Sequence, residues 1–171
     1  MNKLRTLAKS GILFITLFVS LKIYYNKQIG TEIDKYNNVP VYFNSIPFTT
    51  DGTSRAKDGY IFGKKYSNIE FINRYYYDIY NQKLGLKKLN LSDLKNGEKI
   101  KNLYYFDGIE NAKSGDIIIS KNVLGDEYMG IITKIEGNKI ELIRQNFWKT
   151  SRITLDENKG DIIGILSLEE K

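Results

Sequence analysis

An uncharged, largely apolar run over residues 10–21 follows three basic residues, Lys3, Arg5 and Lys9. A basic start followed by about 7–15 apolar residues is typical of a secretory signal, and its positive charge stays on the cytoplasmic side. Residues 10–25 would span about 24 Å as a helix, slightly less than a hydrocarbon core of about 30 Å. We therefore predict a signal or membrane-anchor segment over residues 1–25, followed by an exported domain.

Three interpretations of this segment stay open. An uncleaved single-pass anchor is favoured, because Tyr24 and Tyr25 would lie at the membrane interface and no Ala-x-Ala-like cleavage site follows. A cleaved signal, which would leave a secreted or periplasmic protein, is the second interpretation. A buried amphipathic helix is the least favoured, because the run has no polar face.

The segment that follows has weaker patterning. Residues 26–38 show little periodicity and are predicted to be a linker, which leaves residues 39–171 as the folded domain. Residues 39–43 predict a short extended piece, since Pro40 disfavours a helix there. Residues 51–63 contain three glycines among polar side chains and predict a loop.

One helix is predicted to begin at residue 68. Ser67 and Glu70 fit a capping box, in which the hydroxyl of the first accepts a hydrogen bond from the main-chain N–H of the second. Apolar side chains then recur at helical spacing on one face, at Ile69, Ile72, Tyr76, Ile79 and Tyr80. We expect the helix to end near Gln82 and Arg74 to pair with Asp78 across one turn.

From residue 114 onward the pattern is that of β-strands. Strands are predicted over residues 116–120, 129–135, 140–145, 152–155 and 161–168, with a hairpin turn over 136–139. In the second of these, Met129, Ile131, Thr133 and Ile135 share one face. Ile132 lies on the other, so both faces of this strand are expected to be covered. A helix followed by a mostly antiparallel sheet predicts an α+β fold.

The amino-acid composition limits the catalytic groups and binding sites that this chain can have. The chain of 171 residues has 26 Lys and Arg, 20 Asp and Glu, and neither Cys nor His. It therefore has no thiolate nucleophile, no imidazole base and no usual transition-metal ligands. The acidic pairs lack calcium-loop spacing and no phosphate-binding loop is present, so no metal or cofactor is expected. The net charge of +6 lies mostly in the first 22 residues, which argues against nucleic-acid binding.

Five stretches, taken in order, carry a resemblance to a known family. They are DGYIFGKKYSNIEFINRYYY at 58–77, KSGDIII at 113–119, YMGII at 128–132, LIRQN at 142–146 and DIIGIL at 161–166. Their order and spacing resemble the CHAP family (cysteine, histidine-dependent amidohydrolase/peptidase), a relative of the NlpC/P60 cell-wall amidases. The resemblance runs from Val39 to Leu168. It implies a papain-like core in which the helix beginning near Asn68 packs on a mostly antiparallel sheet from the C-terminal half.

The residues that carry the family's reaction are replaced in this chain. Asn68 stands in the place of the nucleophilic cysteine, Tyr128 in that of the histidine and Arg144 in that of the residue that orients the histidine. A carboxamide cannot act as a thiolate, and a phenol with a pKa near about 10 is a poor base at neutral pH. We therefore predict that the domain is not an enzyme.

The resemblance also implies a remnant cleft at the start of the helix, which would bind a peptidoglycan peptide or an envelope protein. The residues predicted to line it are Tyr66, Asn68, Glu70, Tyr128, Gln145, Asn146 and Trp148. Amides and aromatic rings of this kind hold peptides by hydrogen bonds and stacking. Two alternatives stay open: a hydrolase that uses carboxylate or tyrosine chemistry, and an interaction protein whose cleft is vestigial.

Overall fold

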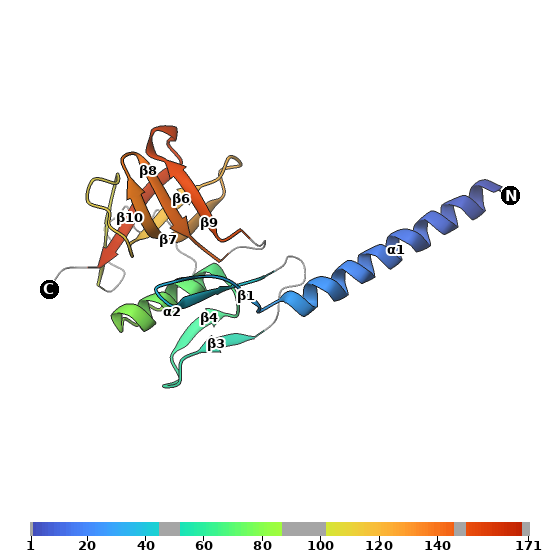
Figure 1. The fold of residues 1–171 in the computed structure, drawn as a ribbon, viewed down its shortest axis with the longest axis horizontal. Helices are drawn as coiled ribbons and strands as arrows, with labels where there is room; N and C mark the ends of the chain where they lie inside the picture. Colours follow the sequence, from blue (N-terminus) through green and yellow to red (C-terminus); the bar gives the residue numbers. More distant parts are fainter. Residues whose placement is uncertain (1, 45–51, 87–101, 146–149, 169–171) are drawn as a thin grey trace.

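The computed structural model describes residues 2–44, 52–86, 102–145 and 150–168 (Figure 1). The elements within these ranges are two α-helices, one 3-10 helix and ten β-strands. Every strand pairing is antiparallel. The predicted α+β class and the mostly antiparallel sheet are therefore confirmed.

The largest element is a six-stranded sheet from the C-terminal half of the chain. Its strands are β5 (Leu103–Phe106), β6 (Ile117–Lys121), β7 (Glu127–Glu136), β8 (Lys139–Ile143), β9 (Arg152–Asp156) and β10 (Ile162–Leu168), in the spatial order β5-β10-β6-β7-β8-β9. A short 3-10 helix, η1 (Glu157–Lys159), follows β9. The turn between β7 and β8 lies where the sequence predicts it, with Gly137 in the left-handed region at φ +56°. The five predicted strands correspond to β6–β10, whereas β5 was not predicted.

Helix α2 (Asn68–Tyr80) begins at the predicted residue. The side-chain oxygen of Ser67 accepts a hydrogen bond from the Glu70 N–H at 3.1 Å, as in a capping box. The Glu70 carboxylate does not return to Ser67, because it binds the Nε of Arg74 at 2.8 Å instead. This ion pair replaces the one predicted between Arg74 and Asp78. The helix ends two residues before Gln82, because Asn81 adopts the left-handed conformation at φ +54°.

Hydrophobic clusters cover both faces of the sheet. On one face, α2 packs through Phe71, Ile72, Tyr75 and Tyr76 against Ile117, Ile119, Met129, Ile131, Ile143 and Leu166. The second cluster contains Ile109, Ile118, Ile132, Ile140, Leu142, Leu155 and Ile165. A register shift between Ile132 and Lys134 interrupts the alternation of β7, so Ile135 packs against the second cluster and not on the face of Met129.

Two small hairpins lie beside α2. The first joins β1 (Glu32–Tyr36) to β2 (Val39–Tyr42), and the second joins β3 (Thr53–Arg55) to β4 (Ile61–Lys64). The linker predicted over residues 26–38 therefore contains a strand, and the loop predicted over 51–63 contains most of a hairpin. Both strands of the first hairpin contribute to the core that α2 shares with the sheet.

Helix α1 (Asn2–Gln28) projects away from the rest of the molecule (Figure 1). Apolar side chains along it are exposed, among them Leu13 at 70% and Phe14 at 73%. Within the described residues, no helix combines the length and the hydropathy that a membrane crossing requires. The apolar run of the sequence is thus a helix whose apolar side chains are largely exposed.

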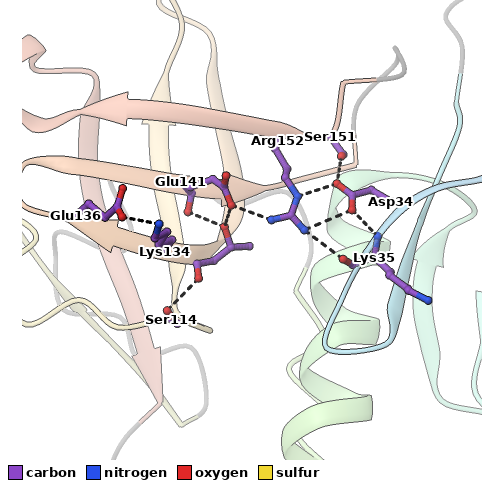
Figure 2. A network of polar contacts seen from close by, with 9 residues as sticks. Asp34, Lys35, Ser114, Lys134, Glu136, Glu141, Ser151 and Arg152 are labelled. Atoms are coloured by element: carbon purple, nitrogen blue, oxygen red, sulfur yellow. Dashed lines mark hydrogen bonds and ion pairs between the residues drawn. The ribbon is translucent and has the colours of Figure 1, made fainter.

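A polar network holds the β1–β2 hairpin against the edge of the sheet (Figure 2). Arg152 on β9 donates from Nε to Asp34 on β1 at 2.9 Å and from Nη1 to Glu141 on β8 at 2.8 Å. Ser151 also donates to the Asp34 carboxylate, and Arg152 reaches the main-chain oxygen of Lys35 at 3.2 Å. One arginine therefore joins two acidic groups that lie far apart in the sequence.

We expect this network to weaken in acid. Burial opposes ionisation of Asp34, but hydrogen bonds from Arg152 and Ser151 hold its pKa below the usual value. Hydrogen bonds from Thr133 and Arg152 likewise lower the pKa of Glu141. A lowered folded-state pKa contributes stability above the unfolded pKa of about 4, and this stability is lost as the pH falls through the folded value.

Urea unfolding of the full chain between neutral pH and about pH 3 measures this loss. The double variant Asp34→Asn, Glu141→Gln should flatten the acid side of the stability curve, because it removes both titrating groups. Exposed Glu110→Gln is the matched control and should leave the curve unchanged. An acid slope in the double variant as steep as in the wild type would contradict the assignment.

Candidate functional site

Asn68 occupies the first turn of α2, in the position that the family resemblance assigns to the nucleophile. The Nδ2 of Asn68 donates to the main-chain oxygen of Met129 at 2.6 Å. The Oδ1 of Asn68 accepts from the main-chain N–H of Gln145 at 3.1 Å. Both polar atoms of the carboxamide are therefore bound to main-chain groups of the sheet.

These two contacts replace a missing step of the β7–β8 ladder. Ile131 pairs with Ile143, so the same antiparallel register, carried two residues further, places Met129 opposite Gln145. The carboxamide of Asn68 carries the same donor and acceptor as a peptide group, and it binds one group from each side. Asn68 therefore attaches the start of α2 to both β7 and the end of β8.

Gln145 extends this arrangement to the first hairpin. Its side chain is buried, and its Oε1 accepts from the main-chain N–H of Tyr42 on β2 at 3.3 Å. Its Nε2 is buried without a hydrogen-bond partner. Gln145 thus lies beside Asn68. Asn146 and Trp148 lie outside the described residues.

Tyr128 lies on the opposite face of the sheet from α2. Adjacent Met129 packs in the cluster that contains α2, whereas Tyr128 packs against the second cluster. The Arg144 guanidinium stacks 4.1 Å from the centroid of the Tyr128 ring. Burial raises the pKa of the Tyr128 phenol, so this side chain is neutral at physiological pH and does not act as a base there.

A pocket of about 330 Å³ lies on the other side of α2, between the helix and the two hairpins. Its lining includes two residues of the predicted cleft, Tyr66 and Glu70, together with Tyr42, Ser54, Lys65 and Arg74. Glu70 is only 2% exposed and Arg74 only 9% exposed. The Oε2 of Glu70 and both terminal nitrogens of Arg74, Nη1 and Nη2, have no hydrogen-bond partner.

Sequence reasoning missed Arg74 as a pocket residue, because its pairing with Asp78 would have placed it on the outer face of the helix. The spacing of Glu70 and Arg74 was an available signal, since residues four apart on a helix are neighbours. The Arg74 guanidinium is also fixed by aromatic rings. Its carbon lies 5.2 Å from the Tyr42 ring centroid and 5.8 Å from that of Phe71.

The described cleft residues therefore lie in three places. Asn68 and Gln145 meet at the junction of α2 with β7 and β8, Tyr66 and Glu70 line the pocket, and Tyr128 stacks with Arg144 across the sheet. That any of them binds a ligand stays a prediction. In the described ranges, no three acidic side chains gather in a way that would hold a metal ion.

Comparison of the chain with protein-family models and with curated proteins finds no significant match.

Proposed function

We propose that this protein is a catalytically inactive, CHAP-like domain with a papain-like arrangement of helix and sheet, which binds peptides of the cell wall. The observation that carries the loss of catalysis in this proposal is the bonding of Asn68. Its carboxamide lies where the family's reaction needs a thiolate, and both of its polar atoms hold main-chain groups. A carboxamide bonded in this way supports the fold, and it is a poor nucleophile because its nitrogen lone pair is delocalised into the carbonyl group.

The surroundings of Asn68 argue against rewired hydrolysis. The nearest counterpart of the family's base is Tyr128, which faces away from Asn68 and stays protonated at neutral pH. An attacking group and its base must lie within hydrogen-bond reach of one another, directly or through one water. These two positions do not meet this condition, so binding is favoured over catalysis.

The proposal includes attachment to a membrane through α1. The exposed apolar side chains of this helix follow a basic N-terminal stretch, a combination that is typical of a signal or membrane-anchor segment. The domain would then face the cell-wall compartment, held by an uncleaved anchor or released after signal cleavage. The mass of the mature N-terminus distinguishes the two, and a full chain that stays free of lipid vesicles on flotation would exclude attachment.

A second candidate is an interaction protein whose cleft is vestigial. The same Asn68 contacts favour it, because they close the start of α2 with internal hydrogen bonds. We nevertheless favour peptide binding, since a separate pocket beside α2 retains buried charged atoms without partners. The vestigial interpretation gives no role to these atoms.

The test is co-sedimentation of the full chain, kept in mild detergent, with purified peptidoglycan sacculi. We expect the chain to sediment with intact sacculi and to stay in solution with sacculi whose peptides have been removed by an amidase. No soluble fragments should be released from about pH 4 to about pH 10, because Asn68 and Tyr128 do not form a nucleophile–base pair. Equal sedimentation with both kinds of sacculi would contradict peptide binding, and fragment release would support the hydrolase.

A further inference from the structure

The pocket beside α2 holds three buried polar atoms that the fold leaves without partners. They are the Nη1 and Nη2 of Arg74 and the Oε2 of Glu70. Buried polar atoms are hydrogen-bonded in most native structures, and an unpaired one in a charged group costs more than one in a neutral group. Because Glu70 and Arg74 both line a pocket, partners for these atoms can come from outside the chain.

The hydrogen bonds within the chain leave these atoms without partners. The Nε of Arg74 and the hydroxyl of Ser54 both donate to Oε1 of Glu70, at 2.8 and 3.0 Å. The Nη1 and Nη2 of Arg74 and the Oε2 of Glu70 make none of these hydrogen bonds and are left for other contacts. The rings of Tyr42 and Phe71 hold the guanidinium in place, so its orientation is set before any ligand binds.

The free groups define the ligand's chemistry. The two terminal nitrogens of an arginine match the two oxygens of a carboxylate, and Lys65 adds a second positive charge to the same pocket. The unpaired oxygen of Glu70 requires an N–H donor close to that carboxylate. A phosphate dianion suits this pocket poorly, because its two negative charges repel the Glu70 carboxylate more strongly than a single carboxylate does.

We propose that this pocket binds the C-terminal end of a peptide, with the α-carboxylate on Arg74 and Lys65 and the last main-chain N–H on Glu70. A volume of about 330 Å³ accommodates only a short ligand, about one or two residues. The edge-to-face pair of Tyr42 and Tyr66 provides an apolar wall for its side chain. The inference rests on the proposed function in taking the ligand to be a peptide.

The probes are N-acetyl-alanyl-alanine with a free C-terminal carboxylate and the same dipeptide as its C-terminal amide, each in the L,L and the D,D form. Calorimetric titration of the full chain in detergent measures their affinities. The dipeptide with the free carboxylate should bind about 10- to 100-fold more tightly than its amide. The amide cannot form the hydrogen bonds between charged groups that the carboxylate forms with Arg74 and Lys65. Inorganic phosphate should not compete. Equal affinity for acid and amide, or competition by phosphate, would overturn the proposal.

Two single variants test whether the ligand binds in this pocket. Lys65→Gln should weaken binding of the free carboxylate about 3- to 10-fold, whereas Lys57→Gln, on the β3–β4 turn outside the pocket, should leave it unchanged. Both positions are exposed, so neither change affects folding. Equal affinities of the two variants would place the ligand elsewhere.

The outcomes separate this inference from the proposed function. If the chain binds sacculi through their peptides but no free dipeptide, the pocket assignment fails and the proposed function stands. If the dipeptide acid binds but the sacculi do not, the pocket stands and its ligand is not a cell-wall peptide.

Discussion

We expect Asn68→Ala to lower the free energy of unfolding by about 2–5 kcal/mol. The change removes the donor to the Met129 oxygen and the acceptor for the Gln145 N–H. Both residues are buried, at 8% and 5% exposure, so each main-chain group is left without a partner. A buried unsatisfied group costs about 1–3 kcal/mol. Urea unfolding of the full chain, followed by circular dichroism, measures the loss.

Two comparisons sharpen this test. Asn68→Asp keeps an acceptor for Gln145 but brings a carboxylate against the carbonyl of Met129, so it should also destabilise. Exposed Asn111→Ala is the matched control and should stay within about 0.5 kcal/mol of the wild type. If Asn68→Ala were as mild as this control, the carboxamide would not hold the helix to the sheet.

A loss of about 3–5 kcal/mol is expected for Arg74→Ala. This change leaves the Glu70 carboxylate buried with only Ser54 as a side-chain partner, and removing one partner of a buried ion pair is costly for this reason. The loss should be seen as a lower midpoint of urea unfolding. Because Arg74→Ala is expected to destabilise the fold, a binding experiment should vary Lys65 or the carboxylate of the ligand instead of Arg74.

The double variant Glu70→Leu, Arg74→Met tests whether the buried, unpaired charge of Glu70 causes this loss of stability. It removes both charges and keeps apolar volume, so it should recover much of the stability lost in Arg74→Ala. Lys83→Ala is the matched control, since Lys83 and Asp58 form an ion pair of the same 2.8 Å length whose side chains are about half exposed. This exposed pair should contribute far less. A double variant no more stable than Arg74→Ala would show that charge burial is not the reason.

Local patterns in the sequence predicted the elements that depend on interactions between residues close together in the chain. The Ser67 cap and the apolar spacing after it gave the start of α2, and the turn at Gly137 gave the β7–β8 hairpin. The β1 strand escaped prediction because Glu32, Asp34 and Lys35 give it a largely polar sequence. Its partner Arg152 lies 118 residues further along the chain, where no local pattern points to it.

The candidate site was predicted less well, for a geometric reason. The family resemblance aligned Asn68 and Tyr128 by sequence, but the side a strand residue faces depends on the register of its neighbours. Pairing of Tyr128 with Ser120, beside the pair Met129 and Ile119, turns Tyr128 away from α2. Arg74 was missed because a helical arginine with two acidic neighbours at four-residue spacing can pair in either direction.

The contacts of Asn68 and Asp34 also determine the order in which the chain can fold. The strands β6 to β9 pair with their neighbours in sequence, so this part of the sheet forms from local hairpins. The bonds of Asn68 span 61 and 77 residues, and that between Asp34 and Arg152 spans 118. On a ribosome adding about 5–20 residues per second, the first half of the chain waits several seconds for these partners. During that interval the apolar face of α2 lacks the sheet that covers it in the folded protein, so this face is exposed to non-native contacts.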